Sequence, residues 1–388
     1  GRRLLYAQFA LVQYLDKGMS QMIQPRGAVA ALKPYVPGKP LQEVRRELGL
    51  TDVVKLASNE NPLGPSPLAL EAMRRALNDT ALYPDSANRD LQGLLAERLG
   101  LGFDQVLVGN GSDELFRLVA EAYLEPGWEA VVPVPSFSVY ESVIRLAGAS
   151  PVPVPLRHGA PDLDATLAAI GPRTRVVFLC SPNNPTGGIL TGQELQRFFD
   201  RLPAGVLVVL DEAYGDYAED PAYPDSLPWL REGRPLVVTR TFSKLYGLAG
   251  VRLGFGLGPA AVLAPLRLIR DPFSVNTLAQ AAGPAALDDQ GHRRRSLAMN
   301  AAGKALLYGE LSRLGLAFEP TQANFILVHL PVPARGLFDR LLRRGVIVRP
   351  TDSFGLPRSI RVTIGTEPQM ERFLTAFEAV LKEGPGAG

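Results

Sequence analysis

The stretch LVVTRTFSKLYGLAGVRLG, residues 236–254, joins an apolar run typical of a buried strand to a lysine and a glycine-rich turn. Lys244 lies between small and hydroxylated residues, which is a poor place for a solvated surface charge. An amine nucleophile must lose its proton, and desolvation or a nearby cation such as Arg252 would lower its pKa. This segment alone fits a reactive amine and an ordinary loop charge about equally well.

Apolar runs of the same kind recur in the sequence around this stretch. From Val54 to about Phe273, short apolar runs alternate with amphipathic segments, which predicts an α/β fold: a mostly parallel sheet covered by helices. The predicted strands are 105–108, 130–133, 176–179, 206–210 and 236–239. Because ligands bind beyond the carboxyl ends of such strands, the loops that follow these runs should converge on one site.

The pattern of apolar and polar residues changes after Asn276. A long helical region runs to Leu314, short strands follow at 325–328 and 360–363, and an amphipathic helix over 368–381 closes the chain. We therefore predict an N-terminal extension over 1–24, a segment over 25–50 that packs with the second domain, a large domain over 51–275 and a smaller α+β domain over 276–388.

Composition excludes several functional classes. The 41 basic and 39 acidic residues are interspersed and leave a net charge of +2, which favours neither nucleic acid nor a membrane surface as a partner. The basic run at 292–295 is more typical of an exposed helix face. No apolar stretch reaches the ~18 residues that span a bilayer. The single cysteine, Cys180, and three histidines without metal-ligand spacing fit a reducing cytoplasm and predict no metal site.

Four loops carry polar or aromatic residues after predicted strands. The loop 109–114 opens a helix and suits an anion, although Ser112 or Asp113 could simply cap that helix. The loop 181–188 contains Asn184 between two prolines, which turn chemistry alone also explains. The other two loops place further candidates at strand ends: Asp211, Tyr214 and Phe137.

An acid such as Asp211 directly after five apolar residues is costly unless it is paired, either with an arginine or with a protonated ring nitrogen. Phe137 would be an ordinary core residue or would stack on a flat ring. An amine, a carboxylate, a phenol, an amide, an anion cradle and an aromatic ring on successive strand ends are the groups that pyridoxal phosphate requires. The combination therefore favours the functional interpretation of Lys244.

The ordered motifs resemble those of the fold-type-I pyridoxal-phosphate aminotransferases, and among them most closely the histidinol-phosphate aminotransferases. The resemblance covers about residues 30–380. Its motifs are SNENPLGP (58–65), YPD (83–85), GNGSDE (109–114), SPNNPTG (181–187), DEAY (211–214), the stretch from Ser243 to Gly254, and RVTIG (361–365). Several motifs in the family's order are a far more specific signal than any one of them.

The resemblance implies a role for each matching residue. Lys244 would form the internal aldimine and then move a proton between substrate and cofactor. Asp211 would pair with the pyridinium nitrogen, Tyr214 and Asn184 would bind the ring oxygen, and Phe137 would stack on the ring. The residues implied to hold the phosphate are Ser112, Asp113, Ser243 and Arg252.

The family's Tyr83 counterpart reaches the cofactor phosphate of a partner subunit, so a homodimer is implied. Arg361 would bind the α-carboxylate of glutamate or 2-oxoglutarate, and Arg349 the phosphate of histidinol phosphate; a plain surface charge remains the alternative for Arg349. Tyr35 would lie on an N-terminal segment that closes over the substrate, and Asn184 would also bind the substrate.

The expected activity is transamination between histidinol phosphate and 2-oxoglutarate. An aromatic aminotransferase and a threonine-phosphate decarboxylase share these motifs and are the alternatives. A transcription regulator built on the same fold would need a DNA-binding module for which the roughly 50 residues ahead of Val54 are too few.

Overall fold

The computed structural model describes residues 25–30, 32 and 39–383. Contacts between Cα atoms divide the chain into two compact units, 1–34 and 35–388. The described part of the first unit contains one short helix, α2 (Gly27–Ala30). The second unit contains the other described helices and strands. The predicted extension over 1–24 lies outside the described residues, and the predicted domain boundaries stay a prediction.

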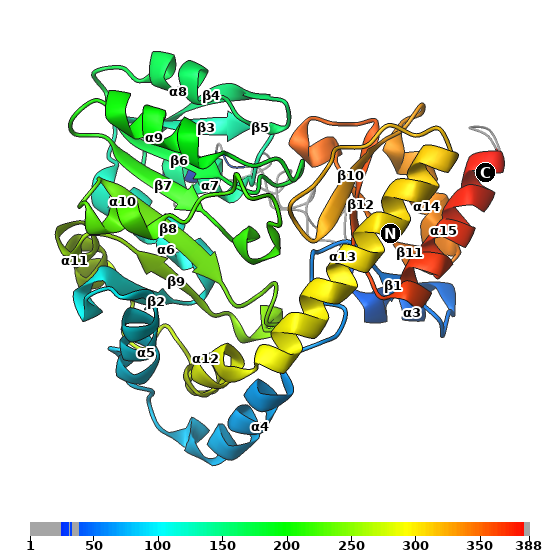
Figure 1. Cartoon of the computed structure of the whole chain (residues 1–388), viewed down its shortest axis with the longest axis horizontal. Helices are drawn as coiled ribbons and strands as arrows, with labels where there is room; N and C mark the ends of the chain where they lie inside the picture. Colours follow the sequence, from blue (N-terminus) through cyan, green and yellow to red (C-terminus); the bar gives the residue numbers. More distant parts are fainter. Residues whose placement is uncertain (1–24, 31, 33–38, 384–388) are drawn as a thin grey trace, which may run out of the picture. The chain divides into compact units, whose positions relative to one another are not determined.

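The described residues of this unit form an eight-stranded sheet, and its strand order confirms the predicted α/β fold (Figure 1). Strands β8, β7, β6, β3 and β4 run parallel to one another, whereas β9 is antiparallel to β2 and β8, and β5 is antiparallel to β4. From one edge to the other the strands are β2 (Val106–Gly109), β9 (Gly254–Leu257), β8 (Leu236–Thr241), β7 (Leu207–Asp211), β6 (Thr174–Cys180), β3 (Glu129–Val134), β4 (Ser150–Arg157) and β5 (Ala160–Pro161).

Helices cover both faces of this sheet, which is why its strands read as continuous apolar runs. In β6, Val176 and Phe178 belong to one apolar cluster, and Val177 and Leu179 to the other, because side chains alternate along a strand. The first cluster includes helices α6 (Gly111–Tyr123), α7 (Val139–Leu146) and α11 (Ala260–Ile269). The second includes α4 (Pro67–Ala76), α5 (Arg89–Leu99), α8 (Leu163–Ala169), α9 (Gly192–Arg201), α10 (Leu227–Arg231) and α12 (Thr277–Asp288).

Strands β4 and β9 are not among the strands predicted from the sequence. In β4, prolines occupy positions 151, 153 and 155 and argue against a strand that pairs on both sides. Because successive N–H groups of a strand point to opposite sides, alternating prolines remove donors from one side only. The other side remains able to pair with β3 in parallel over 150–155. β9 is only four residues long and contains two glycines, so its composition resembled a turn.

Most of the remaining elements form a separate apolar core around a three-stranded antiparallel sheet. That sheet has the order β10 (Phe325–His329), β13 (Ser359–Thr363) and β12 (Arg349–Pro350), while β1 (Val54–Lys55) pairs in parallel with β11 (Val346–Ile347). The helices around it are α3 (Leu41–Leu48), α13 (Gln290–Arg313), α14 (Ala334–Arg343) and α15 (Glu367–Lys382). The predicted closing helix is thus confirmed as α15.

The predicted helical region from Asn276 to Leu314 is two helices, α12 and α13. Asp289 separates them and caps α13, since its carboxylate accepts a hydrogen bond from the His292 N–H at 2.9 Å. Short 3-10 helices complete the described structure: η1 (Leu77–Ala81), η2 (Phe103–Gln105), η3 (Gly215–Tyr217), η4 (Ala249–Val251) and η5 (Asp352–Phe354).

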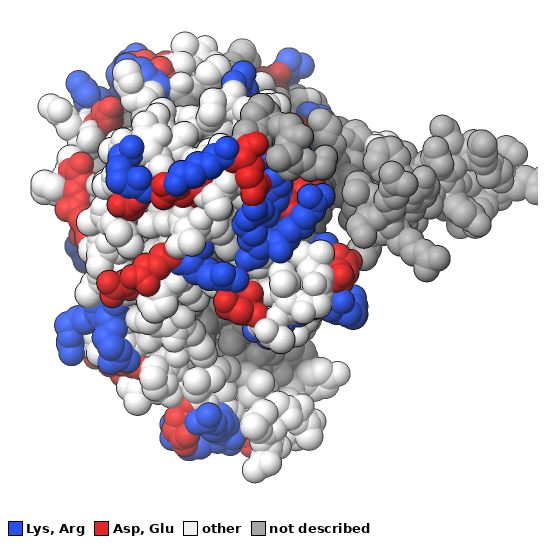
Figure 2. All heavy atoms as spheres, turned by 90° about the vertical axis from the view of Figure 1, so that its right-hand side faces the viewer, with Lys and Arg blue, Asp and Glu red and all other residues white. Residues whose placement is uncertain are grey.

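Charges of both signs are mixed on the face drawn in Figure 2, with no large area of one sign among the residues shown in colour. In the basic run at 292–295, Arg293 forms an ion pair with Asp216 at 3.3 Å. Within the described ranges, no helix combines the length and the apolar character needed to cross a membrane.

Candidate active site

A pocket opens at the carboxyl ends of the central strands, where the sequence analysis placed the site. It brings together most of the predicted residues, and further lining comes from the segment 58–60. The predicted residues that line it are Ser112, Asp113, Phe137, Asn184, Asp211, Tyr214, Ser243, Lys244, Arg252, Arg349 and Arg361.

Lys244 follows β8 and extends into this pocket. Its Nζ donates a hydrogen bond to the Ser58 carbonyl at 3.3 Å and lies 5.5 Å from the centre of the Tyr214 ring. Burial lowers the lysine pKa to about 8, and the positive charge of Arg361 adds to this effect. Arg252, the nearby cation suggested by the sequence, also lowers this pKa, but less than Arg361 does. Its guanidinium forms an ion pair with Asp113 at 3.3 Å. A lysine of this kind has a substantial fraction of reactive free amine near neutral pH.

Asp211 ends strand β7 and is 4% exposed. Three donors surround its carboxylate: the Tyr140 hydroxyl at 2.5 Å, the Thr239 hydroxyl at 3.1 Å and the Ala213 N–H at 3.1 Å. Burial raises the pKa of Asp211 to about 6 although these hydrogen bonds oppose the shift. Such a basic, preorganised carboxylate would bind a protonated ring nitrogen strongly.

Tyr214 and Asn184 present polar groups to the same pocket. Burial raises the pKa of the Tyr214 phenol, so it stays protonated and can donate a hydrogen bond. Asn184 Oδ1 accepts a hydrogen bond from Arg361, which leaves the amide nitrogen of Asn184 as its donor group. Both residues therefore suit a ligand oxygen that carries negative charge.

The anion cradle predicted from the sequence lies at the start of helix α6. A Cβ atom at Gly254 would lie 2.6 Å from the Ser112 nitrogen, and one at Gly111, where φ is +73°, would lie 2.5 Å from Arg252 Nη2. The glycines thus permit a close approach of strand, helix terminus and guanidinium. Arg252 also donates to Ser243 Oγ at 3.4 Å. Since the Asp113 carboxylate pairs with Arg252, only the backbone N–H of Asp113 suits an anion.

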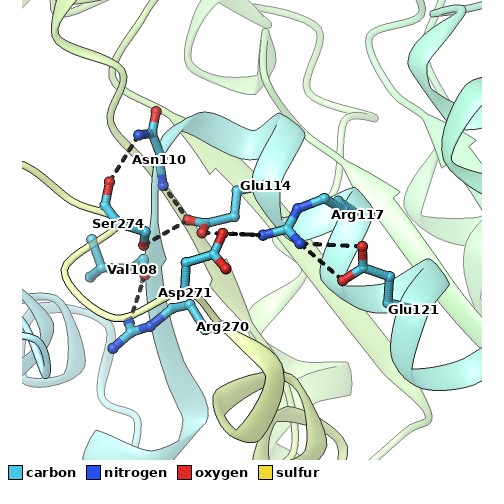
Figure 3. A network of polar contacts seen from close by, with 8 residues as sticks. All are labelled: Val108, Asn110, Glu114, Arg117, Glu121, Arg270, Asp271 and Ser274. Carbon is cyan, nitrogen blue, oxygen red and sulfur yellow. Dashed lines mark hydrogen bonds and ion pairs between the residues drawn. The ribbon is translucent and has the colours of Figure 1, made fainter.

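Figure 3 shows the polar network that supports this cradle. Glu114 Oε2 accepts hydrogen bonds from the Asn110 N–H at 2.6 Å and from the Ser274 hydroxyl at 3.1 Å. Asn110 Nδ2 donates to the Ser274 carbonyl at 2.8 Å, and Arg270 donates to the Val108 carbonyl at 3.1 Å. The end of β2, the start of α6 and the turn at 270–274 are therefore tied together.

Arg349 and Arg361 lie directly opposite each other on the antiparallel strands β12 and β13. Cross-strand partners point to the same face of a sheet, and both side chains reach the pocket. Arg361 donates to the Ala57 carbonyl at 3.0 Å, and its Cζ lies 5.9 Å from the centre of the Phe354 ring. Two guanidinium groups on one wall suit a substrate with a carboxylate or a phosphate.

Two predicted residues are not placed in this pocket. Tyr83 is 82% exposed and does not line it; its ring stacks on Phe273, with the ring centres 4.6 Å apart. Tyr35 lies outside the described residues, so its predicted role stays a prediction.

Three residues that contact the site residues directly received no role from the sequence: Tyr140, Thr239 and Asn59. Asn59 lies in the SNENPLGP motif, and Tyr140 lies three residues after Phe137, in the first turn of α7. No local signal marked them, because their partners lie 71 residues away for Tyr140 and 155 for Asn59.

Comparison with known proteins identifies relatives over nearly the whole chain. The family profile of aminotransferase class I and II matches residues 51–377. A histidinol-phosphate aminotransferase from Symbiobacterium thermophilum is 51% identical over 94% of this chain and 100% of its own length, and one from Moorella thermoacetica is 48% identical over 94% and 96%. A crystal structure of histidinol-phosphate aminotransferase from Sinorhizobium meliloti in complex with pyridoxal 5'-phosphate superposes with a TM-score of 0.85 at 29% identity, covering 94% of this chain and 100% of that one.

Proposed function

This chain belongs to the class I and II aminotransferases, and from that we propose that it is a pyridoxal-phosphate-dependent transaminase acting on histidinol phosphate and 2-oxoglutarate. The products are imidazole acetol phosphate and glutamate. The observation that carries the proposal is that Lys244, the buried carboxylate Asp211 and the cross-strand partners Arg349 and Arg361 all line one pocket.

The pocket fits the cofactor group by group. Gly111 and Gly254 let the start of α6, strand β9 and Arg252 approach one another closely, so backbone N–H groups and a guanidinium gather where a phosphate would bind. Asp211 is placed to hold the ring nitrogen. The other residues that would hold the cofactor are Ser112, Phe137, Asn184, Tyr214, Ser243 and Lys244.

When bound, the cofactor supplies an aldehyde that accepts the amino group and a protonated ring that withdraws electrons from the reacting carbon. Lys244 would hold the cofactor through its side-chain amine and would carry the proton to and from the substrate carbon. Its lowered pKa lets the same amine accept and return a proton near neutral pH. Asp211 would keep the ring nitrogen protonated.

The two arginines explain how one pocket accepts two substrates. Arg361 binds the α-carboxylate of glutamate or 2-oxoglutarate, and its contact with Asn184 orients its guanidinium. Arg349, on the adjacent strand, binds the phosphate of histidinol phosphate. A bidentate pair with each anion would also hold the substrate amine near Lys244.

A substrate panel tests this function. The purified protein with pyridoxal phosphate should form glutamate from histidinol phosphate and 2-oxoglutarate, and the Lys244→Ala variant serves as the control for background turnover. Transamination of phenylalanine or tyrosine with histidinol phosphate left untouched would favour an aromatic aminotransferase. Release of carbon dioxide from threonine phosphate without 2-oxoglutarate would favour a decarboxylase. Either result would overturn the proposed substrate.

We also propose that the working form is a homodimer. Large apolar or aromatic side chains are exposed on two segments that meet where Tyr83 stacks on Phe273; Leu268 is 86% exposed, Tyr83 82% and Leu82 71%. Exposed apolar groups that adjoin one another mark a contact surface. In the dimer, Tyr83 would reach the partner's cofactor phosphate. Light scattering should give twice the 41.9 kDa chain mass, and a monomer that retains full activity would refute this arrangement.

A further inference from the structure

Asn59 has an unusual backbone conformation at the edge of the pocket. Its φ is +57°, in the left-handed region, and it is 1% exposed. Residues other than glycine keep such conformations only where their surroundings hold them. The Asn59 N–H donates to Thr363 Oγ1 at 2.9 Å, and its carbonyl accepts from Asn324 Nδ2 at 3.0 Å. These contacts place the Asn59 side chain between Thr363 and Tyr214.

The hydrogen bonds of this side chain have a defined direction. The Thr363 hydroxyl donates to Asn59 Oδ1 at 3.2 Å, and Asn59 Nδ2 donates to the phenol oxygen of Tyr214 at 2.9 Å. If the amide were rotated by half a turn, the Thr363 hydroxyl, which belongs to a residue only 3% exposed, would lose its acceptor among the described residues. Buried donors are rarely left without an acceptor, so the network selects the first orientation.

This direction determines where the Tyr214 proton goes. The phenol oxygen already accepts from Asn59, so its own hydrogen must point elsewhere, and among the residues that the structure describes no acceptor receives it. Tyr214 lines the pocket. The hydrogen is therefore available to a ligand there. An asparagine that presented its carbonyl oxygen to Tyr214 would instead accept a hydrogen bond from the phenol, and the hydroxyl would not be available to a ligand.

We propose that Asn59 is a positioning residue that directs the Tyr214 hydroxyl into the pocket, where it donates to the ring oxygen of the bound cofactor. The inference rests on the proposed function and extends it to a chain of donors that runs from Thr363 through Asn59 to Tyr214. Thr363 lies two residues beyond Arg361 on β13, so the same strand supports the substrate arginine and the start of this chain.

Two substitutions at Asn59 test the direction of the chain. Asn59→Asp keeps the size but replaces the donor by an acceptor, which would capture the Tyr214 proton. Asn59→Gly removes the side chain and tolerates the positive φ. The readout is the pH midpoint at which the visible absorption of the bound cofactor changes. Losing a donor to a negatively charged ring oxygen makes the cofactor more basic, so Tyr214→Phe and Asn59→Asp should both raise the midpoint by about one pH unit.

A double-mutant cycle separates this effect from others. In the Tyr214→Phe background, Asn59→Gly should leave the midpoint unchanged, and any residual shift from Asn59→Asp measures its added charge alone. If an Asn59 substitution shifted the pH midpoint equally in the wild-type and the Tyr214→Phe background, the inference would be overturned. Should the Asn59 variants fail to fold, Thr363→Val removes the donor to Oδ1 and lets the amide rotate, which should move the midpoint in the same direction; no shift would overturn the inference.

The controls separate this inference from the proposed function. A wild-type protein that binds no pyridoxal phosphate, as judged by visible absorption and by borohydride trapping at Lys244, would refute the proposed function itself. Normal absorption in the wild type together with unchanged midpoints in the variants would refute only the role of Asn59.

Discussion

Replacing Asp211 by asparagine should stabilise the cofactor-free protein while abolishing its catalysis. The carboxylate is buried, and its three donors do not fully replace the water it has lost, so ionising it weakens the fold. The amide has nearly the same shape and carries no charge. Without the anion, however, nothing would keep the cofactor's ring nitrogen protonated, so transamination should fall sharply.

The magnitude follows from the pKa of Asp211, which burial raises from 3.8 to about 6. Between these values the folded chain holds the proton more tightly than the unfolded chain, so the free energy of unfolding decreases as the pH rises through this window. A shift of this size corresponds to about 3 kcal/mol in all. Asparagine does not titrate, so the stability of the variant relative to the wild type should grow by about 2 kcal/mol between pH 4 and pH 8.

Urea unfolding of the cofactor-free proteins at pH 4 and pH 8 measures this change, with the protein concentration held constant because association also stabilises a fold. Asp339→Asn is a matched control, since Asp339 is exposed on α14 and has no desolvation to relieve. The reasoning would be refuted if the free energies of unfolding of Asp211→Asn and the wild type differed by the same amount at both pH values. It would also be refuted if the variant were less stable than the wild type at pH 8.

Three further predictions concern the rest of the site. Lys244→Ala should lose nearly all turnover and the lysine-linked visible absorption; a borohydride-reducible adduct in this variant would show that another amine binds the cofactor. In the wild type, the rate at which Lys244 binds the cofactor covalently should rise with pH and level off above about pH 8, where the amine is unprotonated. Arg349→Gln should lower kcat/KM for histidinol phosphate by about 30- to 100-fold, the value of a charged bidentate contact, and leave the glutamate half-reaction nearly unchanged; equal losses in both would contradict a phosphate role. Gly254→Ala should weaken cofactor binding because its Cβ would lie 2.6 Å from the Ser112 nitrogen, whereas Gly250→Ala, at a position with open space around it, should not. Equal cofactor dissociation constants for the two variants would contradict the predicted phosphate cradle.

Much of the fold and the site could be predicted because the signals are local. Strand β7 is five buried residues that end in Asp211, and an apolar run closed by an acid predicts a strand and a site residue together. The same logic applies to Lys244 after β8 and to the glycines at the start of α6. Each depends on residues within one element, and parallel strands necessarily bring their carboxyl ends to one edge.

The fold class and the groups at the strand ends could be inferred from local residue patterns, because apolar runs and turn residues are features of neighbouring positions. The partners of these groups are known only from the three-dimensional contacts. Asn59 meets Thr363 across 304 positions of chain, and the pairing of Arg349 with Arg361 is a matter of strand register. The charge of Asp211 and the direction of the Tyr214 hydroxyl depend on such contacts, since a side chain's pKa and hydrogen bonds are set by what surrounds it in space.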